Sequence, residues 1–78
     1  MPLETTSQRV GANVRAEMAR HRLSQERIAK QLNISQQALS QRLNGKVAFR
    51  VDELDSLADI LSVSITDLMR RHRSEVSA

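Results

Sequence analysis

An all-helical domain is the fold class that this 78-residue sequence predicts. Hydrophobic residues make up 40% of the chain and aromatic residues only 1%, so Leu, Ile, Val, Met and Ala must build the core. These side chains recur at helical spacing, which favours an all-α domain over a sandwich or barrel. A chain of this size buries roughly 60 to 65% of its unfolded surface. We therefore expect one domain over residues 1–78, ordered over about 7–70.

The first helix is expected from about Gln8 to Arg20, with Thr6 or Ser7 as its cap. Its apolar face repeats at i, i+4 and i+8. The second helix should begin after the cap residue Ser24 and end near Gln31 or Leu32. The apolar positions of these two helices are Val10, Val14 and Met18, then Ile28, Ala29 and Leu32.

A tight turn and a third helix follow. Asn33 tolerates the left-handed conformation that such a turn needs, and Ile34 is apolar enough to lie beneath it. Ser35 can cap a helix that runs from Gln36 to about Asn44 and stops at Gly45.

The segment Lys46–Arg50 is predicted to be a loop, held by insertion of Phe49 into the core. The fourth helix should span about Val51–Leu61 and bury Val51, Leu54, Leu57, Ala58 and Leu61, which are spaced by three or four residues. A short last helix begins after Ser64, which forms an approximate capping box with Asp67. It should bury Ile65 and Leu68, with Met69 as a further candidate.

The second and third helices have the pattern of a helix-turn-helix. Small Ala29 stands where the two helices must approach closely, and the turn residue Asn33 lies four positions later. Apolar anchors hold the angle between the helices: Leu32, Ile34 and Leu39.

The third helix carries an unusually polar outer face. If Leu39 and Leu43 face inward, the outward positions are Gln36, Gln37, Ser40, Gln41 and Asn44. Amide side chains pair bidentately with adenine in the major groove, and serine hydroxyls donate or accept. Any single glutamine is equally an ordinary exposed helix former. The set together, in a stretch without acids from residue 36 to residue 50, favours DNA binding.

The charge distribution points the same way. Residues 1–45 carry seven bases and three acids, whereas residues 46–78 carry five bases and six acids, out of a net charge of +3. A basic first half is typical of a polyanion-binding protein, although a solvated charged surface explains it equally well. The acids from Asp52 to Asp67 are expected on a face turned elsewhere.

Two segments, SQERIAKQLNISQQALSQRLNGK and FRVDELDSLADILSVSITDLM, resemble the Cro and phage-repressor type of regulator, also called XRE-like, over residues 8–69. The resemblance implies a five-helix lambda-repressor-like DNA-binding domain whose third helix lies in the major groove. By that likeness Gln36, Gln37 and Gln41 contact bases, together with Ser40 from the polar face. The implied phosphate contacts are Gln25, Ser35, Asn44, Lys46 and Arg50. Capping alone remains an alternative for Ser35, and solvation for Lys46 and Arg50.

The chain departs from the family pattern at several positions. Arg22 and Asn33 replace the usual glycines, so Arg22 must end the first helix without easy access to positive φ. Arg42 stands where an apolar residue is common, which makes it a further candidate for DNA contact. Arg50 replaces the Ser or Thr cap of helix four, at a cost of about 1 kcal/mol.

The predicted function is a transcriptional regulator, a repressor, that binds a pseudo-palindromic operator as a homodimer. One unit with a few base contacts reads too few base pairs to select a site. The expected dimer contacts are Ile60, Ile65 and Met69 in the C-terminal region, unless these residues simply complete the core of the monomer. The alternative function is an antitoxin or protein-binding module that also binds DNA. The family narrows the host to bacteria or their phages.

Other functional classes find no support in the sequence. The chain has no cysteine, and His21 and His72 are too isolated for a metal site, so no metal or cofactor is expected. No grouping of His, Ser and Asp predicts an enzyme, and no small-molecule ligand is indicated. The lack of a long apolar run or a signal peptide predicts a soluble, cytoplasmic protein without membrane contact. The absence of a C-terminal linker favours a complete, Cro-like chain over part of a longer repressor.

Overall fold

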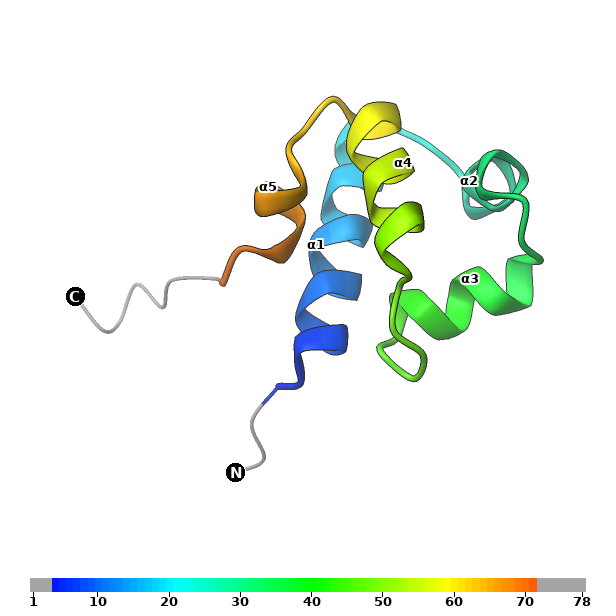
Figure 1. The fold of residues 1–78 in the computed structure, drawn as a ribbon. Coiled ribbons are helices and arrows are strands. Elements are labelled where there is room, and N and C mark those ends of the chain that lie inside the picture. Colours follow the sequence, from blue (N-terminus) through cyan, green and yellow to red (C-terminus); the bar gives the residue numbers. More distant parts are fainter. Residues whose placement is uncertain (1–3, 72–78) are drawn as a thin grey trace.

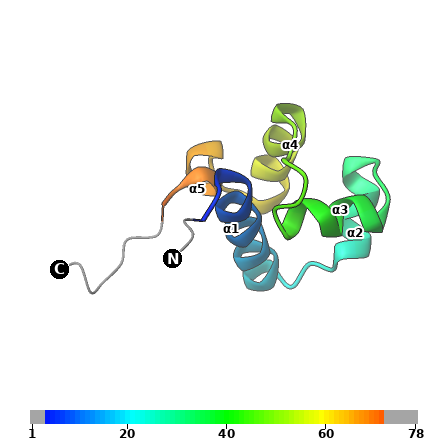
Figure 2. The same cartoon turned by 90° about the horizontal axis from the view of Figure 1, so that it is seen from below.

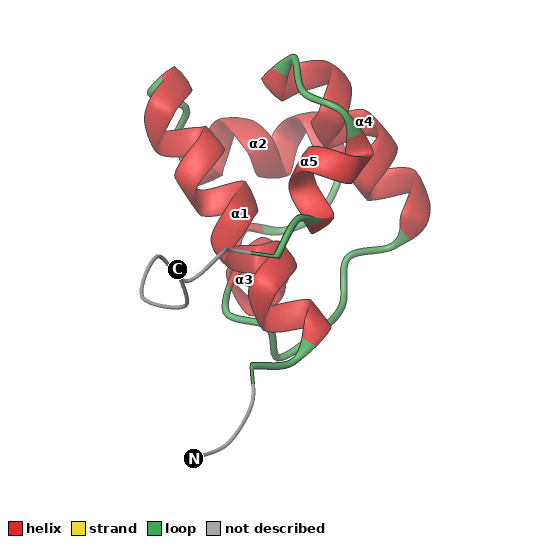
Figure 3. Cartoon of the chain, turned by 90° about the vertical axis from the view of Figure 1, so that its left-hand side faces the viewer, coloured by secondary structure: helices red, strands yellow, loops and turns green. Residues whose placement is uncertain are grey.

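The computed structural model describes residues 4–71, and every element in this range is a helix (Figures 1 and 3). The sequence therefore predicted the fold class correctly. The five helices are α1 (Thr6–His21), α2 (Gln25–Leu32), α3 (Gln36–Leu43), α4 (Val51–Leu61) and α5 (Ile65–Met69).

The long helix α1 is the centre of the arrangement. It contacts α3, α4 and α5, while α2 packs against α3 and α4. As a result α2 and α3 lie on one side of the α1–α4 pair and α5 lies on the other, as both views show (Figures 1 and 2). The helix-turn-helix and the C-terminal helix thus occupy opposite ends of the molecule.

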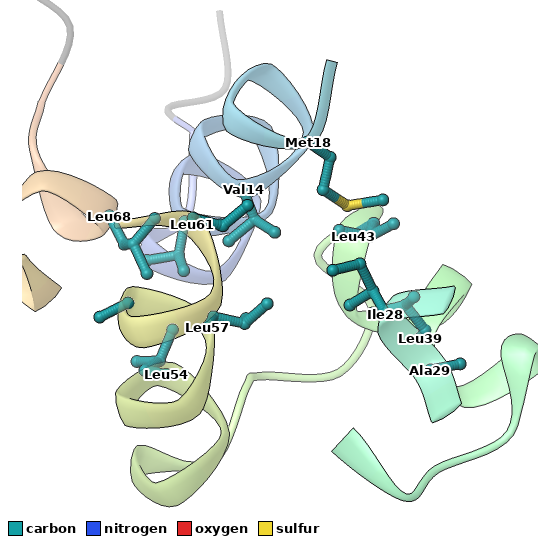
Figure 4. Close-up of a cluster of buried hydrophobic side chains, with 12 residues drawn as sticks. Val14, Met18, Ile28, Ala29, Leu39, Leu43, Leu54, Leu57, Leu61 and Leu68 are labelled. Carbon is teal, nitrogen blue, oxygen red and sulfur yellow. The ribbon is translucent and has the colours of Figure 1, made fainter. Parts of the chain in front are cut away.

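The core lies between these helices and is entirely aliphatic apart from Met18 (Figure 4). Each helix contributes at least one buried side chain, so every helix is held in place by packing against the core. Phe49 is half-buried and packs against the cluster, close to the insertion that the sequence predicted. The fully buried large side chains are Val14, Ile28, Leu39, Leu43, Leu57, Leu61 and Leu68.

Three helices end at a non-glycine residue in the left-handed conformation. Arg22, Asn33 and Ser62 have φ of 56°, 60° and 56°. Asparagine was the expected choice at its position. Arg22 adopts positive φ without the freedom of a glycine, at a conformational cost of roughly 1 to 2 kcal/mol, so the first loop keeps the left-handed helix end that the family glycine would give. In return its N–H donates to the Ala19 carbonyl, one of the acceptors that a helix end leaves free.

Two glycines allow α1 to approach the end of α3. A Cβ at Gly11 would overlap the Leu43 carbonyl oxygen and lie 2.9 Å from the Arg42 carbonyl oxygen. At Gly45, where φ is 80°, a Cβ would lie 2.7 Å from the Cα of Gln8. Because the neighbouring atoms are backbone, no rotamer change could relieve either contact. These glycines fix how closely α3 packs on α1.

The predicted boundaries differ from the structure mainly in α1. Its cap is Thr5, not Thr6 or Ser7, and Thr5 and Gln8 form a reciprocal capping box. The caps Ser24, Ser35 and Ser64 and the span of α4 are as predicted. Val51 is an error of prediction: it is 76% exposed, because this first residue of α4 borders an open apolar pocket instead of packing into the core.

Side chains of α1 hold the short helix α5. Asn13, which is buried, donates through Nδ2 to the carbonyls of Leu68 at 2.9 Å and Arg70 at 2.8 Å. Arg9 donates to the Met69 carbonyl at 3.2 Å. The last carbonyls of a helix have no intrahelical N–H donor, so α1 supplies the donors that a continuing helix would otherwise provide.

Candidate nucleic-acid interface

The turn between α2 and α3 is held by its own backbone and by one serine. The N–H of Asn33 donates to the Lys30 carbonyl, and that of Ile34 donates to the Ala29 carbonyl at 3.0 Å. Ser35 Oγ accepts from the N–H of Ala38 at 3.0 Å, which caps α3. Ala29 is 2% exposed, so the small residue is buried, as a close approach of α2 to its neighbours requires.

The orientation of α3 matches the predicted one. Leu39 and Leu43 are buried, and Gln36, Gln37 and Gln41 are exposed, whereas Ser40 is half-buried. The amide groups of the three glutamines therefore lie on the solvent-facing side of α3, whose opposite side is buried in the core. Amides on a surface are hydrated, so they are free to exchange water for another hydrogen-bonding partner.

Two helix N-termini of the helix-turn-helix carry polar side chains that were expected to contact phosphates. Gln25 is the first residue of α2 and is exposed, directly after the cap Ser24. Ser35 uses its oxygen to cap α3, which leaves its O–H available as a donor. Helix N-termini also present free backbone N–H groups and a partial positive charge, which suits them to anions such as phosphate.

The loop after α3 carries the remaining predicted phosphate contacts, and all three of these side chains are exposed: Asn44, Lys46 and Arg50. The loop begins tightly, because the N–H of Lys46 donates back to the Gln41 carbonyl at 2.9 Å and that of Gly45 donates to the Arg42 carbonyl at 3.1 Å. Lys46 is thereby fixed close to the C-terminal end of α3.

Arg42 lies in a different environment from the other candidates. Its Nε donates to Glu53 Oε1 at 2.9 Å, and its Nη1 donates to the Ala38 carbonyl at 3.1 Å. The side chains of Arg42 and Glu53 are only 14% and 10% exposed. The guanidinium is therefore engaged within the protein, and the structure gives no support to the expectation that Arg42 reaches DNA.

Glu53 is the residue that the sequence analysis missed. We expected the acids that follow Asp52 on a face turned away, but Glu53 is buried and faces α3. Its Oε1 also accepts from the backbone N–H of Arg50 at 2.8 Å, which caps α4 in place of a side chain at position 50. A signal was present, since a glutamate three residues after a helix cap is the second half of a capping box.

The family profile described as helix-turn-helix, of the Cro/C1 or XRE-like type, matches residues 14–68. The chain belongs to this helix-turn-helix family. The match covers the larger part of the sequence and confirms the resemblance drawn from its motifs. Family membership indicates a DNA-binding transcriptional regulator.

Solved structures support the fold of this helix-turn-helix domain. Two crystal structures of the clp gene regulator ClgR from Corynebacterium glutamicum superpose on it, with TM-scores of 0.80 and 0.75. The first is 22% identical and covers 86% of this chain and 71% of the other; the second is 24% identical and covers 87% and 86%. At this identity the likeness concerns the fold alone. No curated protein matches the sequence at a significant level.

The helix-turn-helix domain has a second exposed feature, an apolar pocket of about 210 Å³. Met69 is 41% exposed and lines this pocket together with Phe49 and Val51. Of the expected dimer contacts, only Met69 lies there. Ile60 and Ile65 are partly buried and pack against the core, as the alternative interpretation had it. The other lining residues are Thr6, Ser7, Val10, Ala48 and Leu54.

None of the helices within residues 4–71 combines the length and apolarity that crossing a bilayer requires.

Proposed function

We propose that this protein is a repressor that binds a pseudo-palindromic operator as a homodimer, with α3 in the major groove. The observation that carries the proposal is the exposed amide face of α3, supported from below by Leu39 and Leu43. No acid interrupts the sequence from Gln36 to Arg50, so no carboxylate on this segment repels the phosphates.

Base recognition is assigned to α3. Gln37 and Gln41 are four residues apart, so they are neighbours on one helix face and can read adjacent base pairs. Gln36 and Ser40 complete the set. Each good bidentate pair contributes about 1 to 3 kcal/mol of discrimination against the wrong base.

Phosphate contacts are assigned to groups on both sides of this face. Gln25 and Ser35 stand at the N-termini of α2 and α3, and Asn44, Lys46 and Arg50 follow the end of α3. Contacts of this kind set the position of the protein on the duplex without reading sequence. They also make binding salt-dependent, because each neutralised phosphate releases counterions.

The proposed dimer contact is the apolar pocket around Met69. Exposed apolar surface is the kind that association removes from water, and the pocket is continuous with the loop that follows α3. A two-fold contact there keeps the loops of both copies near the symmetry axis. Half-sites read by two such recognition helices lie about 34 to 36 Å apart, one turn of the duplex.

The test is selection from a random duplex library, run with the wild type, Gln37→Ala and the control Gln31→Ala at two salt concentrations. Gln31 is an exposed glutamine near the C-terminal end of α2 and is not among the proposed DNA contacts. We expect the wild type and the control to recover the same two-fold symmetric motif. Gln37→Ala should lose definition at one symmetric pair of positions, by about 1 to 3 kcal/mol.

Weak binding without sequence preference, unchanged by Gln37→Ala and abolished by salt, would contradict the proposal. The alternative function, an antitoxin or another module that binds a protein partner, would then be the one to test. The polar character of α3 argues against this second function, because protein-docking helices present an apolar face to their groove.

A further inference from the structure

One carboxylate oxygen connects the two parts of the proposed DNA-binding surface. Glu53 Oε1 accepts from Arg42 Nε at 2.9 Å and from the Arg50 N–H at 2.8 Å. Arg42 belongs to the last turn of α3, and Arg50 is the residue directly before α4. Glu53 therefore ties the end of the helix proposed to read bases to the far end of the loop proposed to grip phosphates.

The near-complete burial of this pair gives the connection its strength. Hydrogen bonds between ionised groups are roughly twice as strong as neutral ones. Removing one partner leaves the other charge poorly solvated, so neither side chain can leave without cost. Arg42 is also restrained from the other side by its bond to the Ala38 carbonyl. The guanidinium thus has a defined position relative to the axis of α3.

The opposite end of the loop is restrained by α1. Gly45 lies against Gln8, and the N–H of Lys46 donates to the Gln41 carbonyl at 2.9 Å. With Glu53 holding Arg50, both ends of the segment that carries the proposed phosphate contacts are fixed. The spacing between the glutamines of α3 and the backbone of Arg50 then depends on Glu53 and on the ion pair that holds it.

We propose that Arg42 and Glu53 are positioning residues, which fix Arg50 relative to α3 so that phosphate contact and base reading occur in register. This inference rests on the proposed function. It assigns Arg42 a role in DNA binding without contact to DNA. The competing arrangement is one in which Arg42 leaves Glu53 and binds a phosphate itself.

A double-mutant cycle separates these arrangements. Arg50→Ala is measured in the wild type and in a Glu53→Ala background, with affinity for the selected operator as the readout. We expect Arg50→Ala to weaken wild-type binding about tenfold, the size of a charged hydrogen bond. In the Glu53→Ala background, which itself binds more weakly, the further loss should be less than about threefold, because the two sites are coupled.

Gln25→Ala is the matched control for this cycle. Gln25 is a proposed phosphate contact at the start of α2, and the hydrogen bonds that hold Arg42 and Glu53 do not involve α2. Gln25→Ala should weaken operator binding by the same factor in the wild type and in the Glu53→Ala background. Glu53→Gln keeps an oxygen that can accept both hydrogen bonds, so it should restore most of the effect of Arg50→Ala. A merely destabilised protein would show neither the selective loss nor this recovery.

Two results would overturn the inference. The first is an equal cost of Arg50→Ala in both backgrounds. The second is unchanged or tighter binding by Glu53→Ala, combined with a further loss when Arg42→Met is added, because Arg42 would then contact DNA directly. If Glu53→Ala does not fold, Arg42→Met replaces it in the cycle, since this variant keeps the bond from the Arg50 N–H to Glu53.

Failure of the proposed function is recognised separately, by Gln37→Ala on the same operator. If Gln37→Ala weakens binding and the cycle is additive, only the positioning role is wrong. If the wild type shows no preference for any duplex, both the proposed function and the positioning role are wrong.

Discussion

The two exposed surfaces of this domain differ in what they leave to solvent. The outer face of α3 presents amide groups, which water satisfies through hydrogen bonds. The pocket beside α5 presents Met69 and Val51, 41% and 76% exposed, which water cannot satisfy. Both surfaces rest on the same aliphatic core and are joined by the loop after α3.

This difference indicates two kinds of partner. Burial alone contributes little binding free energy for hydrogen-bonding groups. They therefore favour a partner whose own hydrogen-bonding groups match their geometry, as base edges do. Apolar groups gain from any partner that excludes water, so they provide association with little geometric demand. We therefore expect specificity to depend on α3 and dimer stability to depend on the pocket.

Leu39→Ala should have the largest effect, because it removes the support beneath α3. Leu39 is fully buried, and such truncations cost about 2 to 5 kcal/mol of unfolding free energy. Urea denaturation followed by circular dichroism measures the loss. Gln41→Ala, on the exposed face of the same helix, should leave stability within about 0.5 kcal/mol. Equal losses in the two variants would mean that α3 is not oriented as described.

Met69→Gln should weaken self-association while leaving the monomer folded. The substitution keeps the length of the side chain and makes it polar. A loss of about 1.4 kcal/mol at the interface corresponds to a tenfold change in the dimer constant, and we expect an effect of that order. Sedimentation equilibrium without DNA gives that constant. Val47→Gln is the control, since Val47 is also exposed and apolar but does not line the pocket. A similar loss in both variants would reject the pocket as the dimer contact.

Asp67→Asn should have the smallest effect, and one that depends on pH. Hydrogen bonds from the backbone and side chain of Ser64 lower the pKa of Asp67 below its ordinary value of 3.8, with a further contribution from Arg70. The ionised carboxylate therefore stabilises the fold. This stabilisation is complete above the ordinary pKa and is lost as pH falls through the lowered one.

Thermal unfolding at neutral pH and near pH 3 tests this prediction. The difference between the wild type and Asp67→Asn should be present at neutral pH and should shrink in acid. Asp55→Asn, an exposed carboxylate in the middle of α4, is the control. A difference that persists unchanged in acid would show that the cap on α5 does not depend on the carboxylate charge. If Asp67→Asn also changed the DNA sequence preference, specificity would depend on α5 as well as on α3.

The features that were predicted correctly depend on residues close in sequence. Ser24, Ser35 and Ser64 cap the helices that follow them, and Asn33 adopts the left-handed turn, because each interaction closes within a few residues. The amide face of α3 was predicted from the two leucines four residues apart. Which of these amides meets a base stays a prediction.

The features that were missed join residues far apart. Arg42 and Glu53 are 11 positions apart, and Asn13 reaches the Leu68 carbonyl across 55. Periodicity also counted Val51 as buried, since a periodic pattern defines a face and does not say where the neighbouring helix ends. Such errors follow from treating each helix by itself.

The sequence by itself determined that the chain is helical, where its turns lie and which side of α3 faces solvent. Those properties follow from backbone conformation and hydrophobic spacing, which act locally. Only the tertiary structure decided that Arg42 is held within the protein, that Glu53 faces α3 and that Met69 borders a pocket. Charge pairing and burial depend on which helices meet, and that is settled only when α1, α3 and α4 pack around a shared core.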